Sequence, residues 1–292
     1  MAQLLQIKTR MKSVDSTLKI TKAMKMIAAA RLVKAKDRVV KTEPVARKLE
    51  SIVQHLRDSE YIAKSPLSEI RTEGKELYVV LTTDRGFCGG FNFKLLHFAE
   101  DEKLNPKDSV DIAPIGGKGL DYFEKAKDIL KLSDEVTTIW EEELFNQSRL
   151  LYQELEDLFL KGEYKAIYLV YNKFESVLAQ HPIKKQLLPI VFHQLEEDKN
   201  KELHSEIDYL FEPDEKSLVD TILPLYCNLN TFLGFVETKA GEYGARMTSM
   251  EGANINGEKL TRQLKIQFQR ARQEAITREL TELIGGVECL RR

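Results

Sequence analysis

The sequence lacks any run of eighteen consecutive apolar residues, and charged residues occur throughout its first thirty positions. A membrane-spanning helix needs about twenty mostly apolar residues, and a secretory signal peptide needs an uncharged apolar core. We therefore predict neither a membrane span nor a signal peptide. Cysteine is also scarce, since Cys88, Cys227 and Cys289 are far apart and form no CxxC pair. An odd, scattered set of thiols favours free cysteines in a reducing compartment.

Glycine and proline are absent from the N-terminal part of the chain, where the first proline is Pro44 and the first glycine is Gly74. Without these helix breakers, one helix of about forty residues is predicted there, roughly 60 Å long at 1.5 Å per residue. Its apolar residues follow the spacing of a coiled coil. They are Leu4, Ile7, Met11, Val14 and Leu18, continued by Ile20, Met24, Ile27, Ala28, Ala35 and Val39.

The C-terminal residues 258–290 are predicted to form a second long helix with the same kind of seam. Its apolar residues are separated by alternating steps of four and three: Ile276, Leu280, Leu283, Val287 and Leu290. A seam of this period needs a partner helix. We therefore predict that the two terminal helices pair as an antiparallel coiled coil. A coil this long exceeds the radius of any domain that 292 residues can form, so it should protrude from the globular part.

The net charge of -2 conceals a strong asymmetry. Residues 1–57 contain fourteen Lys or Arg against four Asp or Glu, a balance of +10 that leaves -12 for the remaining 235 residues. A long basic helix attracts acidic partners. Nucleic acid, an anionic membrane surface and a protein lined with carboxylates are the candidates, beside the simpler alternative of a solvated basic face.

The middle of the chain alternates between strand and helix patterns. After a linker over residues 59–76, strands are predicted at Leu77–Thr83, Val110–Ile115, Ala166–Tyr171 and Gln186–Val191. Helices are predicted at Phe91–Lys103, Lys118–Lys127 and Leu144–Leu160. This alternation predicts a parallel or mixed sheet flanked by helices. Pro189 indicates an edge strand or an irregular strand end, and Glu212-Pro213-Asp214 reads as a helix start.

These patterns together predict an α/β chain. It consists of an N-terminal coiled-coil helix over residues 1–57, a central Rossmann-like α/β domain over residues 75–195, and a C-terminal coiled-coil helix over residues 208–290 that pairs with the first.

The best enzyme-like feature is the glycine-rich turn Thr82–Asn92 between a predicted strand and helix. Such turns can hold phosphate, but the spacing of its glycines matches neither a dinucleotide-binding nor a P-loop motif. A tight turn explains them without a ligand. The cluster Gly116–Gly119 is a weaker candidate of the same kind. The five histidines form no metal motif, and Cys88 has no neighbouring base in the sequence. We therefore predict no catalytic residue, cofactor or metal.

Four segments resemble a known family, in that family's order along the chain. Residues 271–290, ARQEAITRELTELIGGVECL, closely resemble the C-terminal signature of the gamma subunit of F-type ATP synthases. ITKAMKMIAA at 20–29, TDRGFCGGFN at 83–92 and YLFEPD at 209–214 resemble its N-terminal helix, its central turn and its foot. Departures occur at Val287 and Cys289, where alanine is usual, at Glu251-Gly252, where a basic and a small residue are common, and at Phe211, where tyrosine is frequent.

The resemblance implies a non-catalytic, central-stalk rotor. Family members place the coiled coil inside a ring of alternating alpha and beta subunits, with the globular part against the epsilon subunit and the membrane c-ring. Ion flow turns the rotor and drives ATP synthesis or hydrolysis in the ring. No nucleic acid and no direct membrane span are implied. Because the first helix begins almost at Met1, no transit segment is expected, which favours a peripheral position on the cytoplasmic face of a bacterial inner membrane or its organelle equivalent.

The resemblance also implies roles for single residues. Arg272, Gln273 and Thr277 match positions that bond to the stator ring, and Met24 with its neighbours Lys22 and Lys25 matches a region tied to coupling. The foot that meets the c-ring and epsilon would contain Tyr209, Phe211 and Glu212. The apolar tip would contain Leu283, Ile284, Val287 and Leu290.

Two alternatives from other classes remain at the level of sequence. A basic coiled-coil adaptor for nucleic acid or an acidic protein predicts, for nucleic acid, an affinity that falls steeply with salt. A nucleotide-binding α/β enzyme predicts that the isolated chain binds or turns over a nucleotide.

Overall fold

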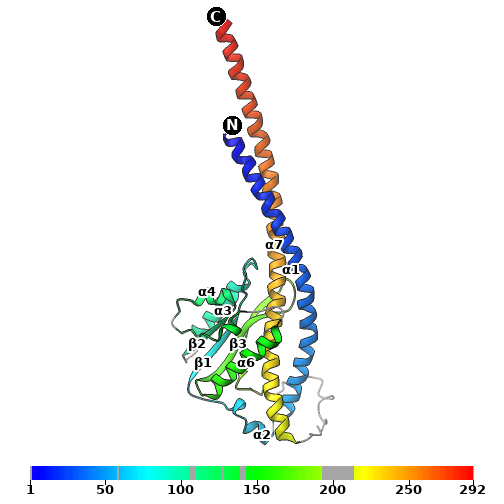
Figure 1. Ribbon diagram of the computed structural model, residues 1–292, viewed down its shortest axis with the longest axis vertical. Helices are drawn as coiled ribbons and strands as arrows, with labels where there is room; N and C mark the ends of the chain where they lie inside the picture. The colour runs from blue at the N-terminus through cyan, green and yellow to red at the C-terminus, as the bar shows by residue number, and fades with distance from the viewer. Residues whose placement is uncertain are drawn as a thin grey trace. The chain divides into compact units, whose positions relative to one another are not determined.

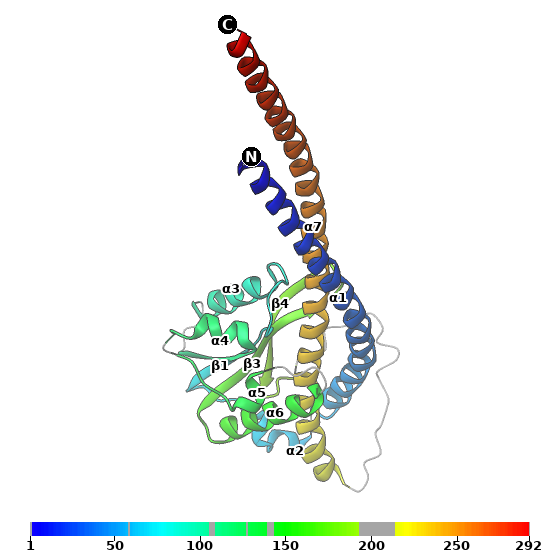
Figure 2. The ribbon, with the colours of Figure 1, turned by 45° about the horizontal axis from the view of Figure 1, so that its top comes forward.

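The computed structural model describes residues 2–57, 59–104, 109–126, 128–138, 143–192 and 214–291 (Figures 1 and 2). The chain forms two compact units. Unit 1 comprises Met1–Ala30 and Arg246–Arg292, and unit 2 comprises Arg31–Ala245. No helix among the described residues is long and apolar enough to cross a membrane.

Two long helices contribute to both units, α1 over Ala2–His55 and α7 over Glu215–Arg291. Pro44 and Pro224 lie inside these helices and do not end them. The helix start predicted around Asp214 is confirmed, because the Asp214 carboxylate accepts hydrogen bonds from Ser217 N at 2.8 Å and Ser217 Oγ at 2.9 Å. These bonds lower the pKa of Asp214 and cap the first turn of α7.

In unit 1, the two helices pair in the antiparallel sense that the sequence predicts. Leu18 lies against Gly257, Thr21 bonds to Asn254, and Lys25 pairs with Glu251. Residue numbers thus rise along α1 as they fall along α7. Leu4, Ile7, Met11, Val14 and Leu18 are all partly buried, so this part of the predicted seam is confirmed.

The continuation of the α1 seam differs from the prediction. Ile20 and Ile27 are 60% and 55% exposed, so their assignment to the seam was wrong. Thr21 takes the place of Ile20 because its hydroxyl bonds to Asn254 across the coil. Met24 and Ala28 are partly and fully buried, as predicted.

The C-terminal seam also differs from the prediction. Leu264 is 2% exposed, whereas Leu283 is 67% exposed, and Ile276, Leu280, Val287 and Leu290 are exposed as well. The register of the pairs places the start of α1 opposite about residue 275 of α7. Residues 276–290, which we call the free stretch, therefore extend beyond α1, and their predicted pairing with it was wrong.

Unit 2 contains a four-stranded mixed sheet in the order β2-β1-β3-β4. The strands are β1 (Lys75–Leu81), β2 (Val110–Ile115), β3 (Tyr164–Phe174) and β4 (Gln180–Leu188). β1 pairs in parallel with both β2 and β3, and β4 pairs antiparallel with β3. The predicted mixed sheet is confirmed, with β4 at the edge. The last strand begins at Gln180 rather than Gln186, because residues 180–185 are mostly polar and carry no apolar strand signal.

Helices cover both faces of the sheet (Figure 2). On one face α3 (Phe91–Leu104) and α4 (Gly117–Phe123) enclose a core with Tyr78, Val80, Leu95 and Ile112. On the other, α6 (Leu144–Leu160) joins the unit 2 parts of α1 and α7 over Leu77, Val79 and Leu81. The short helix α5 spans Asp134–Thr137. The predicted bounds of α6 are confirmed to the residue, whereas α4 ends at Phe123 rather than Lys127.

The predicted linker 59–76 contains ordered structure. It holds α2 (Glu60–Ala63), the 3-10 helix η1 (Pro66–Ser68) and the start of β1. Ser59 and Ser65 cap the two short helices, and Ile62 and Leu67 are buried in the core. The polar composition of this segment hid these two apolar anchors.

Candidate functional site

The coiled coil of unit 1 contains a polar layer that brings three of the predicted site residues together. Thr21 Oγ1 donates to Asn254 Oδ1 at 2.6 Å, and Asn254 is buried. On the flanks Lys22 pairs with Glu258 at 3.0 Å, and Lys25 pairs with Glu251. Met24 lies partly buried between the two lysines. A buried polar pair in an apolar seam fixes the register of a coiled coil, so this layer sets where α1 starts along α7.

Thr21 and Asn254 were missed at the level of sequence. Two features of the sequence could have indicated them. The apolar spacing of the first helix is interrupted at Ile20, and Asn254 lies three residues before Gly257 and ten before Leu264, at seam spacing. Gly257 permits close approach, because a Cβ atom there would lie 2.6 Å from Leu18 Cδ2.

Arg272, Gln273 and Thr277 lie exposed on α7 near the start of α1. Ala271 and Ala275 beside them are partly buried and mark the side that faces α1. At 100° per residue, Gln273 and Thr277 point almost opposite that side, and Arg272 lies on its flank. The three residues are therefore available to another molecule. The layer around Lys22 lies about fourteen residues away, roughly 20 Å along the coil.

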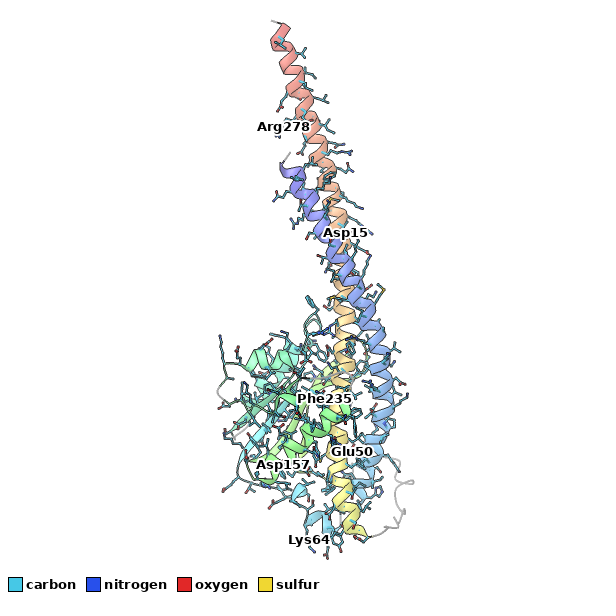
Figure 3. All side chains as sticks on the ribbon, in the orientation of Figure 1. Asp15, Glu50, Lys64, Asp157, Phe235 and Arg278 are labelled. Atoms are coloured by element: carbon cyan, nitrogen blue, oxygen red, sulfur yellow. The ribbon has the colours of Figure 1, made fainter. Side chains whose placement is uncertain are left out.

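The free stretch presents an apolar stripe along one side of the helix. Its six residues fall within an arc of roughly 120° at 100° per residue. In Figure 3, where Arg278 marks this part of α7, the side chains have no second helix beside them. The stripe comprises Ile276, Leu280, Leu283, Ile284, Val287 and Leu290, all of them exposed. Such a row is the mark of a surface that another molecule covers.

The predicted foot lies outside the described residues. Tyr209, Phe211 and Glu212 all fall in the segment 193–213, so their placement relative to the other site residues stays a prediction.

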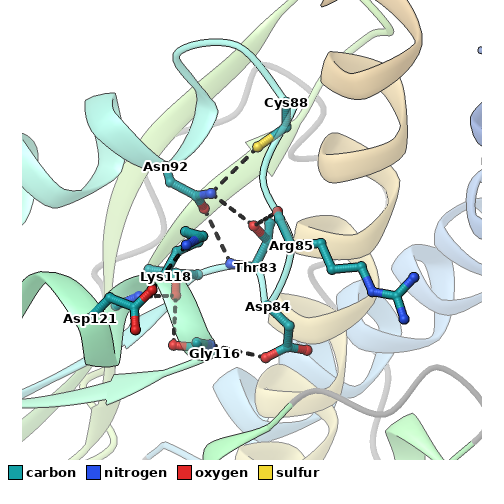
Figure 4. A network of polar contacts seen from close by, with 11 residues as sticks. Thr83, Asp84, Arg85, Cys88, Asn92, Gly116, Lys118 and Asp121 are labelled. Atoms are coloured by element: carbon teal, nitrogen blue, oxygen red, sulfur yellow. Dashed lines mark hydrogen bonds and ion pairs between the residues drawn. The ribbon is translucent and has the colours of Figure 1, made fainter. Parts of the chain in front are cut away.

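In unit 2, the two glycine clusters of the sequence lie together and form a polar network (Figure 4). Thr83 N donates to Asn92 Oδ1 at 3.1 Å, and Asn92 Nδ2 donates to Thr83 Oγ1 at 2.8 Å and to Cys88 Sγ at 3.4 Å. Lys118 forms an ion pair with Asp121 at 2.9 Å. The Asn92 side chain thus holds the glycine-rich turn together through its bonds to Thr83 and Cys88.

The geometry of this network favours a structural role over phosphate binding. The Asp84 carboxylate accepts the N–H of Gly117 at 3.0 Å, at the start of α4 where an anion would bind. Gly116 has a φ of +92°, and a Cβ there would lie 2.5 Å from Thr82 O. The glycines therefore serve a tight crossing of two loops, as the sequence reading favoured.

The chemistry of catalysis finds little support in the described part of the chain. No group of three or more His, Cys, Asp or Glu side chains is placed to hold a metal ion there. The side chains of Cys88 and Cys227 are both buried. Burial raises the pKa of the Cys227 thiol far above its usual range, so it stays protonated and unreactive.

Comparisons with known proteins agree over the full length of the chain. A family model described as ATP synthase matches residues 3–290. The chain is 36% identical to the ATP synthase gamma chain of Geotalea uraniireducens and 37% identical to that of Geobacter metallireducens, over 100% of each chain.

Solved structures share the fold at lower identity. The Euglena gracilis mitochondrial ATP synthase in rotational state 3, with OSCP, F1 and c-ring, contains a chain with a TM-score of 0.66 at 21% identity. The match covers 99% of this chain and 95% of that one. The rotor of the same assembly in rotational state 1 gives a TM-score of 0.62 at 18% identity, covering 94% and 99%.

Proposed function

We propose that this chain, which belongs to the ATP synthase gamma chain family, couples ion flow to ATP synthesis and hydrolysis by rotation. The chain is a non-catalytic, central-stalk subunit of an F-type ATP synthase. In this proposal the coiled coil of unit 1 turns inside a ring of alternating alpha and beta subunits. Unit 2 turns with the epsilon subunit and the membrane c-ring.

The observation that carries the proposal is the extension of α7 beyond the start of α1. Up to about residue 275 the two helices bury the residues of their shared seam against each other. The free stretch continues the apolar spacing with its stripe exposed. A contiguous exposed apolar stripe is typical of a surface that another protein covers, and a ring that encloses the end of the helix would cover it.

The stator contacts of the proposal are made by Arg272, Gln273 and Thr277. Their exposed side chains lie close to the point on α7 that the start of α1 reaches, so beyond this point the stator ring meets a single helix rather than two. The planar guanidinium of Arg272 suits a carboxylate, to which it can donate two parallel hydrogen bonds. Gln273 and Thr277 add neutral hydrogen bonds that specify orientation.

The tip of the proposal is formed by Leu283, Ile284, Val287 and Leu290. An apolar side chain has no preferred hydrogen-bond direction, so an apolar tip can turn within an apolar sleeve without breaking specific bonds. Val287 is larger than the alanine that is usual at this position, and it adds apolar area to the same stripe.

The basic helix and the foot complete the proposal. Lys22 and Lys25 form ion pairs with Glu258 and Glu251, which link α1 to α7 around Met24. In the proposal this region transmits force between the two helices and also contacts acidic loops of the ring. Tyr209, Phe211 and Glu212 are assigned to the contact with the c-ring and epsilon. The assembled complex is membrane-attached, and we assign its central stalk to the cytoplasmic face of a bacterial inner membrane or the equivalent organelle side.

Reconstitution tests the proposal directly. The purified chain should show no ATPase activity, and cognate alpha and beta subunits should assemble around one copy of it and gain activity. A variant that ends after Ala275 keeps the whole paired coil and serves as the matched comparison. It should fold like the full chain but bind the ring more weakly. If the full chain adds no activity to cognate alpha and beta subunits, the proposed coupling role is wrong.

A further inference from the structure

A buried carboxylate lies between α1, the sheet and α7 in unit 2. Glu237 on α7 is 4% exposed and borders a cavity of about 250 Å³. Its one recorded hydrogen bond among the described residues comes from Phe174 N, which donates to Oε2 at the long distance of 3.4 Å. A buried carboxylate normally needs stronger partners than this, so Glu237 calls for a role.

The charged groups around Glu237 do not neutralise it. From α1 the cavity is lined by Glu43, Arg47 and Glu50, and Arg47 is already bonded to Glu43 at 2.5 Å. From the sheet, Tyr171, Lys173 and Lys185 line it, and Lys185 Nζ donates to the neutral Asn230 Oδ1 at 2.8 Å. Neither lysine lies within ion-pair distance of Glu237 in the described structure.

The protonation of Glu237 is therefore balanced near neutral pH. Burial raises the pKa of Glu237 to about 7, and the negative charge of Glu43 adds to this rise. The hydrogen bond from Phe174 and the charges of Lys173 and Lys185 lower it by less. Below this pH the side chain is a neutral acid that the cavity tolerates, and above it a buried anion faces the carboxylate of Glu43.

We propose that Glu237 is a proton-operated latch, which holds the Glu43–Glu50 segment of α1 against the sheet when it is protonated and releases that segment when it is ionised. Ionisation sends the proton to solvent and leaves a charge that the closed arrangement cannot pair. Outward movement of α1 relieves the repulsion from Glu43 and admits water.

Linkage gives the size and the sign of the effect. In the open arrangement Glu237 is hydrated and has its usual pKa of 4.5, whereas in the closed arrangement the pKa is about 7. The closed form therefore binds the proton more tightly, and closing is favoured at low pH. Opening should increase roughly tenfold from pH 6 to pH 8, with little further change at higher pH.

Hydrogen exchange of the full chain tests the latch. Amides of residues 43–53, corrected for the intrinsic effect of pH, should exchange about tenfold faster at pH 8 than at pH 6. Glu237→Gln removes the titration at nearly constant volume, so its exchange should be slow and equal at both pH values. Glu124→Gln removes an exposed carboxylate elsewhere in unit 2 and should behave like the unchanged chain.

A second measurement keeps the test decisive if the Gln variant folds poorly. Infrared titration of the unchanged chain should show one protonated carboxyl group that is lost near pH 7. Lys185→Met removes a cation that favours ionisation and should move this titration upward. The proposal is overturned if the corrected exchange of residues 43–53 is the same at pH 6 and pH 8, or if no carboxyl group titrates near neutrality.

The latch goes beyond the proposed rotor function and does not depend on it. Both measurements use the isolated chain, so they succeed or fail whether or not the alpha and beta subunits assemble around it.

Discussion

Two stretches of α7 in unit 1 carry the same apolar period and have opposite surroundings. Residues 254–275 lie against α1, with Asn254 and Leu264 buried, whereas residues 276–290 continue the period with the six apolar side chains of the stripe exposed. The difference arises in the partner, since α1 begins opposite about residue 275. A heptad pattern therefore predicts that one face of a helix has a partner, but it does not identify the molecule that provides the partner. The paired stretch holds the chain together, and the free stretch is left for another protein.

The largest difference between the two stretches should appear when one leucine is truncated in each. Leu264→Ala should lower the free energy of opening of the coil by about 2–4 kcal/mol, because it leaves a cavity in the seam. Leu283→Ala should change it by less than about 0.5 kcal/mol in the isolated chain. Hydrogen exchange of the amides of residues 4–28 measures both. Equal effects would show that the free stretch is covered in the isolated chain after all.

The sequence predicts those elements that their own apolar pattern defines, and it fails where the structure depends on a partner. The helix Leu144–Leu160 was predicted to the residue because one strong apolar face defines it, and the mixed sheet followed from three buried strands. The first half of β4 was missed because its residues are mostly polar and only partly buried, against neighbours that a single sequence does not reveal. The partner of Ile276 and Leu283 could not be predicted, because the spacing of a seam is the same whether its own chain or another covers it.

Site prediction depended on a different kind of information. Arg272, Gln273 and Thr277 came from a family resemblance, since no local rule distinguishes them from other exposed helix residues. Their exposure agrees with contact to another molecule, while their roles stay predictions. Thr21 and Asn254 were missed because a polar seam pair is visible only once the register of the two helices is known.

A charged residue at the junction of the two stretches should matter only in the complex. Arg272→Ala should leave the opening of the isolated coil unchanged within about 0.5 kcal/mol. In the assembled complex it should weaken binding of the ring by about 1.5–3 kcal/mol, as expected for a hydrogen bond to a charged group. Arg272→Lys should recover only part of this, because an ammonium lacks the planar fork of arginine.

The control for this prediction is Arg262→Ala, which removes the same charge from an exposed position in the paired stretch. Titration of the variants with alpha and beta subunits, read out as ATPase activity, compares them. If Arg262→Ala and Arg272→Ala weaken assembly equally, the effect is one of general charge, and the specific role of Arg272 is refuted.

Two glycines of α7 offer a smaller and more local comparison. Gly257→Ala places a methyl group against Leu18, so it should destabilise the coil by about 1–2 kcal/mol despite the better helix propensity of alanine. Gly252→Ala meets no atom within 4 Å and should stabilise the helix by up to about 1 kcal/mol. Exchange of residues 4–28 again gives the measurement. A stabilising Gly257→Ala would mean that the helices are further apart at Leu18 than described.

The smallest effect should come from the ion pair between Lys25 and Glu251, whose side chains are 39% and 46% exposed. Lys25→Glu should weaken the coil by about 0.2–1 kcal/mol, Glu251→Lys by a similar amount, and the double exchange should restore most of the loss. Because Glu251 engages Lys25 within the coil, Lys25 is less available to an acidic group of another molecule. A double-mutant cycle at low and high salt measures whether the ion pair contributes to the stability of the coil. Coupling that vanishes at low salt as well as at high salt would show that the pair contributes nothing, and Lys25 would then be as free to meet the ring as any exposed lysine of α1.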